Sequence, residues 1–169
     1  QYHARVASYL ATLGNKVDIW EVGNEVNGNW TGPYADVGSK IYDAYKQVKA
    51  AGKRSELTLW YNDGCGNGPS ELDPLAFSQK YVPADMRNGL DYVLVSYYES
   101  QCSNIRPSKA TLTAFFAKLH ALYPNSRIGF GEVGFTVLAG EEIEVVRGRR
   151  MRHGIHGAKT GAADGAGRE

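Results

Sequence analysis

The feature that most constrains the fold is a regular alternation of short apolar runs with longer amphipathic stretches. The short runs are rich in β-branched and aromatic residues, as strands are, and they span 17–23, 56–62, 91–98 and 127–133. Each gap holds apolar residues at helical spacing, and the strands begin about 35 to 40 residues apart, the length of a βα unit. Strands that strictly alternate with helices pair in parallel through right-handed crossovers. The sequence therefore predicts an α/β chain with four parallel strands, and the mostly apolar strands predict that both faces of the sheet are covered.

Glycine and proline mark the expected helix ends. A helix over 1–13 ends at Gly14, and a later short helix is disturbed by Pro83 and closed by Gly89. Each of the other helix starts has a proline in its first turn. These starts lie at 32–33, 73–74 and 107–108.

The chain changes character after Phe135. Residues 136–169 hold 7 Gly and 5 Arg and few large apolar side chains, so this segment buries little surface. We therefore expect a domain over 1–135 and a Gly/Arg-rich tail over 136–169 that lies outside the domain core. Within the tail, we expect at most a short helix over 141–151.

Composition excludes several classes of protein. The 169 residues suit one domain of roughly 100–200 residues, and 19 Lys and Arg balance 18 Asp and Glu, which argues against nucleic acid as a partner. The apolar runs fall short of the about 20 residues that cross a membrane, and the chain does not open on a secretory leader. The four histidines have no metal-ligand spacing, so neither a metal nor another cofactor is expected.

Two strands end in a carboxylate. The run DIWEVGNE ends at Glu25, and the run IGFGEVGF contains Glu132, 107 residues later. The carboxyl ends of parallel strands face the ligand, so both side chains are expected at one site. Hydrolysis of a glycosidic bond needs at least two facing carboxyl groups, because one must donate a proton and the other must attack the anomeric carbon.

The run WEVGNE at 20–25 resembles the fourth strand of the clan A retaining glycoside hydrolases, whose (β/α)8 barrels include cellulases, mannanases, xylanases and β-galactosidases. The resemblance implies that Asn24 hydrogen-bonds the sugar 2-hydroxyl, that Glu25 is the general acid/base and that Glu132 is the nucleophile. It covers residues 1–135 as the fourth to seventh βα units, which is an incomplete, half TIM barrel without a recognisable eighth strand.

The run DYVLVSYY at 91–98 resembles the sixth strand of the same clan. Tyr98 then matches the tyrosine that holds the nucleophile in its ionised form, while Ser96 stands where many members carry histidine. Trp30 has two open interpretations, stacking on a sugar ring or packing on its own loop. Glu21 is in phase with Glu25, and we interpret it as a buried structural acid.

Cys65 and Cys102 follow the second and third predicted strands. A disulfide between their loops would fit a secreted or extracellular polysaccharide-degrading enzyme, and two independent thiols are the alternative.

The resemblance implies retaining hydrolysis of β-glycosidic bonds in oligo- or polysaccharides, without a cofactor. For this mechanism we expect carboxyl groups about 5–5.5 Å apart. The alternative is a catalytically silent barrel fragment that binds carbohydrate or self-associates. Half a barrel leaves two strand edges unpaired, so a homodimer that completes the barrel is a further expectation.

Overall fold

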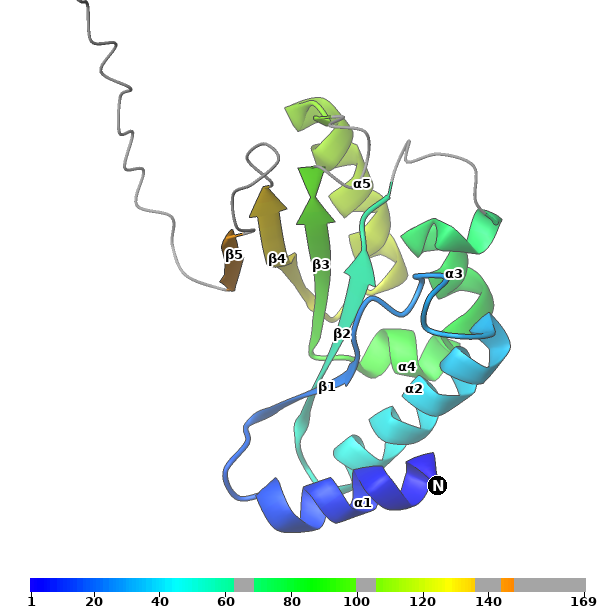
Figure 1. Ribbon diagram of the computed structural model, residues 1–169, viewed down its shortest axis with the longest axis vertical. Coiled ribbons are helices and arrows are strands. Elements are labelled where there is room, and N and C mark those ends of the chain that lie inside the picture. The colour runs from blue at the N-terminus through cyan, green and yellow to red at the C-terminus, as the bar shows by residue number, and fades with distance from the viewer. Residues whose placement is uncertain (63–68, 100–105, 136–143, 148–169) are drawn as a thin grey trace, which may run out of the picture.

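The computed structural model describes residues 1–62, 69–99, 106–135 and 144–147. It is an α/β fold with one five-stranded sheet in the order β1-β2-β3-β4-β5 (Figure 1). The first four strands are parallel, and β5 runs antiparallel to β4. The strands are β1 (Ile19–Gly23), β2 (Arg54–Trp60), β3 (Tyr92–Tyr98), β4 (Arg127–Phe135) and β5 (Glu144–Arg147).

Helices fill the gaps between the parallel strands. They are α1 (Tyr2–Leu13), α2 (Tyr34–Ala50), the short 3₁₀ helix η1 (Ser70–Leu72), α3 (Pro74–Tyr81), α4 (Ala84–Gly89) and α5 (Lys109–Leu122). The predicted four-stranded parallel sheet with intervening helices is confirmed. Two of the predicted helix starts are capped by a side chain. Asp73 Oδ1 accepts a hydrogen bond from the Ala76 N–H at 2.7 Å, and Ser108 Oγ accepts one from the Thr111 N–H at 3.1 Å. No helix in the described part of the chain is long and apolar enough to cross a membrane.

One element of the predicted tail differs from expectation. Residues 144–147 form strand β5 rather than part of a helix, with Glu144 opposite Phe135 and Arg147 opposite Glu132. A short isolated helix is marginal in water, whereas two consecutive valines favour pairing with an open strand edge. The helix predicted over 141–151 is therefore wrong at these residues. The domain boundary at 135 stays a prediction.

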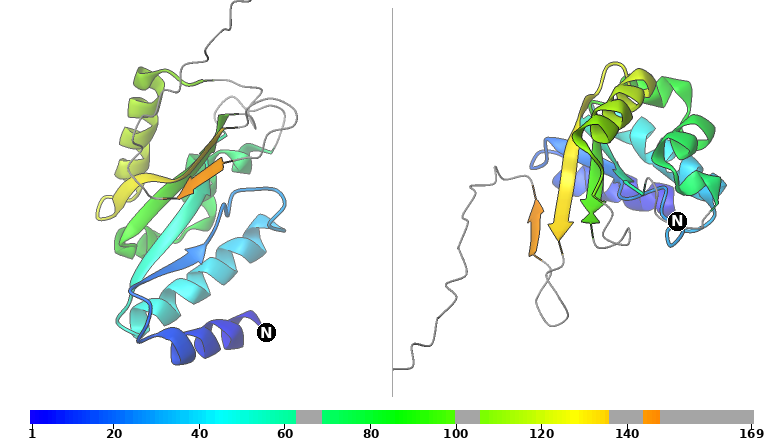
Figure 2. Two further views of the ribbon diagram at one scale, coloured as in Figure 1. Left: turned by 60° about the vertical axis from the view of Figure 1, so that its left-hand side comes forward. Right: turned by 90° about the horizontal axis from the view of Figure 1, so that it is seen from above.

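The hydrophobic core lies on one face of the sheet. Leu57, Leu59, Val93 and Val95 are fully buried there against helices that gather on the same side (Figure 2). Strand alternation sends the intervening residues to the opposite face, which we call the polar face. The polar face carries Glu21, Glu56, Thr58, Ser96, Tyr98 and Glu132.

None of these polar-face residues belongs to the core cluster, but Thr58 and Ser96 are buried, and Trp60, which alternation places on the same face, packs against Trp30. The expectation that both faces of the sheet are covered stays a prediction. The expectation that Glu21 is buried is wrong. Glu21 is exposed, and its carboxylate accepts a hydrogen bond from Thr58 Oγ1 at 2.6 Å.

Candidate active site

Glu25 sits just beyond the end of β1 in an unusual backbone conformation. Its φ is +48°, and among the described residues it is the one residue other than glycine with a positive φ. The Gly28 N–H donates to the Glu25 carbonyl at 2.8 Å and closes a tight turn. A side chain in the left-handed region is strained, and such strain gathers at functional sites. The turn therefore singles out Glu25 as a candidate functional residue.

Asn27 fixes this turn to the end of β2. Its side chain is fully buried. Its Nδ2 donates to the carbonyls of Trp60 at 2.8 Å and Leu72 at 2.6 Å, and its Oδ1 accepts from the Trp60 N–H at 2.7 Å. One amide thus makes three hydrogen bonds to backbone groups of Trp60 and Leu72. Asn27 and Gly28 form an Asn-Gly pair, which is a turn signal, but this pair does not reveal that the Asn27 amide reaches across to the end of β2.

We predict that Asn27→Ala lowers the free energy of unfolding by about 3 kcal/mol, because a net hydrogen bond contributes about 1 kcal/mol and three are lost. Urea denaturation should show a lower midpoint at an unchanged slope. Asn29→Ala in the same loop is the matched control: Asn29 is exposed, and its change should stay within about 0.5 kcal/mol. Equal losses in the two variants would contradict the role of Asn27.

Glu132 reaches the polar face through an irregularity in β4. Val95 lies opposite Phe130, but the next residue, Ser96, lies opposite Glu132, so Gly131 is an extra residue. The Phe130 ring packs against the Phe116 ring of α5, with 5.0 Å between the ring centroids, on the face of the sheet that the helices cover. In a regular strand, residues two apart share a face, and Glu132 would point with Phe130 toward the helices. The bulge therefore turns Glu132 to the polar face.

Tyr98 holds the Glu132 carboxylate. The Tyr98 hydroxyl donates a hydrogen bond to Glu132 Oε2, from the neighbouring strand and the same face. Hydrogen bonds to a carboxylate are strong and directional, so this one fixes the orientation of the Glu132 side chain. The pairing of these two residues was expected from the sequence, and the structure brings them into direct contact.

Glu25 has the opposite electrostatic environment. Burial raises the pKa of Glu25, and the negative charges of Glu132 and Glu21 raise it further. The nearby Ser96 hydroxyl lowers it in part, although this buried hydroxyl has no well-aligned hydrogen-bond partner among the described residues. The negative charge of Glu132 is close enough to act on Glu25, so the two carboxyl groups lie at the same end of the sheet.

The remaining predicted site residues lie on the loop that follows β1 or outside the described residues. Asn24 is exposed beside Glu25. Trp30 packs edge-on against Trp60, with 5.0 Å between the ring centroids. Its side chain is nevertheless 57% exposed, so much of the ring surface remains accessible to solvent. Cys65 and Cys102 lie outside the described residues. Within the described ranges, no cluster of three or more His, Cys, Asp or Glu side chains could hold a metal ion.

No protein-family model, curated protein or solved structure matches this chain. The chemistry of the site is therefore argued from its own geometry. That geometry is a pair of carboxyl groups at the carboxyl end of a parallel sheet, one hydrogen-bonded by a tyrosine and the other biased toward its protonated form.

Proposed function

We propose that the chain hydrolyses β-glycosidic bonds in oligo- or polysaccharides with retention of configuration, and that its βα units are half of a (β/α)8 barrel of the clan A glycoside hydrolase kind. The observation that carries this proposal is the contrast between Glu25 and Glu132. Burial and neighbouring negative charge raise the pKa of Glu25, and the Tyr98 hydroxyl donates a hydrogen bond to the Glu132 carboxylate. A carboxyl group that keeps its proton to higher pH, beside a second carboxyl group whose orientation is fixed, is what an acid and a nucleophile require.

The reaction proceeds in two displacements. In the first, a Glu132 oxygen bonds to the anomeric carbon while the bond to the leaving oxygen breaks, and Glu25 gives its proton to that oxygen. In the second, Glu25 takes a proton from water, the water oxygen bonds to the anomeric carbon, and the ester to Glu132 breaks. Each group returns to its starting protonation state, and no cofactor enters the balance.

Two exposed side chains on the loop that follows β1 suit carbohydrate. Trp30 presents an apolar ring on which a sugar could stack, and Asn24 supplies an amide for a sugar hydroxyl. The turn that holds Glu25 connects β1 to the segment carrying Trp30, so the acid and the proposed sugar platform are positioned by the same loop.

We predict that Tyr98→Phe lowers kcat/KM on aryl β-glycosides by about 10- to 100-fold. A hydrogen bond to a charged group contributes about 1.5–3 kcal/mol, and each 1.4 kcal/mol is a factor of ten. The matched control is Tyr97→Phe, which removes the hydroxyl oxygen of the preceding residue. The Tyr97 ring packs against Tyr61 on the opposite face of the sheet, which the helices cover. Equal losses in both variants would mean that the Tyr98 hydroxyl has no particular role.

The proposed function is tested directly by hydrolysis of a panel of aryl β-glucosides, mannosides, xylosides and galactosides. The chain should release phenol from at least one sugar. Glu132→Ala should abolish this release, and Glu25→Ala should strongly reduce it for glycosides of poorly acidic phenols, while both variants keep the native far-UV spectrum. Folded wild-type protein without activity on any sugar would contradict catalysis.

One observation favours a second candidate, a carbohydrate-binding fragment without catalysis. Glu21 is exposed and the core cluster lies on the other face of the sheet, so part of the polar face is open to solvent in the described part of the chain. A homodimer could complete a barrel if β4 paired with β1 of a second copy, but β5 already pairs with that edge of β4. Binding of an oligosaccharide without its hydrolysis would support this candidate.

A further inference from the structure

Ser96 carries a buried hydroxyl on the polar face. It lies on β3, an inner strand that pairs with β2 on one side and with β4 on the other. The residue is fully buried, and its Oγ has no hydrogen-bond partner among the described residues. A buried polar atom without a partner costs stability, so it is seldom kept without a reason. This hydroxyl is therefore a candidate for a group that serves the site.

The neighbours of Ser96 place its hydroxyl between the two proposed catalytic acids. In the sheet register Ser96 lies directly opposite Glu132 on β4. Two residues further along β3, Tyr98 shares this face and donates to Glu132. On its other side, the Ser96 hydroxyl is close enough to the Glu25 carboxyl to act on it. Burial has the largest influence and raises the pKa of Glu25, and the Ser96 hydroxyl acts in the opposite direction.

We propose that Ser96 is a positioning residue for Glu25, with a hydroxyl that completes its hydrogen bond only when Glu25 gives up its proton. The proposal rests on the proposed glycosidase function and assigns a further residue to the same site. Because Ser96 is fully buried, it acts through Glu25 rather than on the sugar itself. A serine hydroxyl suits this part, since it rotates and can turn its proton toward a new acceptor.

The hydroxyl acts when negative charge develops on Glu25. While Glu25 is protonated, its carboxyl is a weak acceptor, and the Ser96 hydroxyl stays without an aligned partner. As the proton passes to the leaving oxygen in the first displacement, Glu25 becomes a carboxylate and the Ser96 hydroxyl donates to it. In the second displacement Glu25 takes a proton from water, and this hydrogen bond is given up again. An interaction that strengthens as the transition state forms accelerates the first displacement, because it is absent from the ground state.

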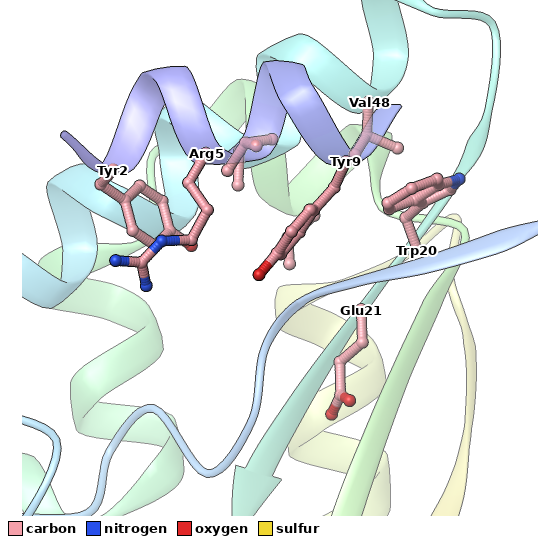
Figure 3. A pocket seen from close by; sticks show the side chains of 9 residues that line it. Tyr2, Arg5, Tyr9, Trp20, Glu21 and Val48 are labelled. Atoms are coloured by element: carbon pink, nitrogen blue, oxygen red, sulfur yellow. The ribbon is translucent and has the colours of Figure 1, made fainter. Parts of the chain in front are cut away.

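The charges around Glu25 increase its need for a donor. Among the described residues, the charged groups that act on Glu25 are Glu132 on β4 and Glu21 on β1, and both are negative. The Glu21 side chain points away from helix α1 (Figure 3). On β2, Thr58 is uncharged and donates to Glu21, and on β5, Arg147 lies opposite Glu132 in register. A carboxylate that forms beside two others is stabilised by a neutral donor such as a serine hydroxyl.

Ser96→Ala in the full chain should lower kcat/KM on glycosides of poorly acidic phenols by about tenfold, the usual effect of one hydrogen bond to a charged group. It should also move the alkaline limb of the pH–rate profile to higher pH, because Glu25 without this donor holds its proton more firmly. Ser96→Cys fills the same space with a weak donor, so it should resemble Ser96→Ala rather than the wild type. The matched control is Ser78→Ala, at a fully buried serine of α3 whose Oγ donates to the Pro74 carbonyl at 2.6 Å, and it should leave the limb in place.

A measurement without substrate separates this inference from the proposed function. Carbon-13 labelling of the glutamate side chains lets NMR follow the ionisation of Glu25, and the signal that disappears in Glu25→Gln assigns it. In Ser96→Ala and Ser96→Cys, the Glu25 carboxyl should titrate at higher pH than in the wild type and in Ser78→Ala.

Two results would overturn the inference while the proposed function stands. One is an active Ser96→Ala variant in which the titration of Glu25 is unaltered, and the other is a limb that moves equally in Ser78→Ala. Folded wild-type protein without hydrolysis would contradict the proposed function. It would also remove Ser96 from catalysis, even if Ser96→Ala raises the pH at which Glu25 titrates.

Discussion

Glu132→Ala is expected to lower kcat/KM on the best aryl β-glycoside by about 10⁴-fold or more, since the variant has no group to form the glycosyl intermediate. Initial rates of phenol release measure the loss. The matched control is Glu56→Gln, an acid on the same face of the sheet but near the opposite ends of the strands. That control should retain most of the activity, and a comparable loss in both variants would remove Glu132 from its proposed role.

Azide should rescue Glu132→Ala in a diagnostic way. The small anion fits the space left by the carboxylate and attacks the anomeric carbon from the side that Glu132 would have used. The product is then an α-glycosyl azide, of inverted configuration, which proton NMR identifies. A β-glycosyl azide would instead indicate that Glu132 acts on the opposite side of the sugar, as the acid/base.

The second large effect concerns Glu25 and pH. Burial, together with the charges of Glu132 and Glu21, raises the pKa of Glu25, so the acid remains protonated and competent above the usual range of a glutamate. The rate should fall as pH rises through that raised pKa. Glu25→Gln should lower kcat/KM by about 10²- to 10⁴-fold on glycosides of poorly acidic phenols. The loss should be much smaller on dinitrophenyl glycosides, whose leaving group departs without a proton. Equal losses on both substrates would contradict acid catalysis.

Glu21→Gln refines the same prediction. The Glu21 charge raises the pKa of Glu25, so its removal should move the alkaline limb of the pH–rate profile to lower pH. An unchanged limb, or one displaced to higher pH, would show that Glu21 does not act on Glu25.

The raised pKa also affects stability. A folded-state pKa above the unfolded value means that ionisation of Glu25 opposes folding, so its contribution to stability is full at low pH and is lost as pH rises through the folded-state pKa. Glu25→Gln should therefore be more stable than the wild type above that pKa, and the advantage should vanish at acidic pH. Thermal melts across pH measure the difference.

The parallel sheet could be predicted from local signals. Each parallel strand is a β-rich run between turn residues, and Asp73 and Ser108 cap helices at the predicted starts. The contact between Tyr98 and Glu132 was implied by the resemblance of DYVLVSYY to the sixth strand of the clan A glycoside hydrolases, not by spacing or periodicity.

The orientation of Glu132 could not be predicted in this way. Alternation from Phe130 would have sent it toward the helices, and only the extra residue at Gly131 turns it to the polar face. A glycine within a strand is a weak signal of a bulge, and IGFGEVGF contains three. Strand β5 could not be predicted either, because pairing depends on which surfaces meet in three dimensions.

The central claim, that Glu132 is the nucleophile of a retaining hydrolase, is tested most directly by trapping its intermediate. Incubation with 2-deoxy-2-fluoro-β-glycosyl fluorides forms a sugar ester on the nucleophile as fluoride leaves, and the fluorine at C2 slows its hydrolysis. Intact mass spectrometry should show one added sugar, and peptide mapping should locate it on Glu132. A label on Glu25, or folded protein that none of the gluco, manno, xylo and galacto reagents labels, would contradict the account.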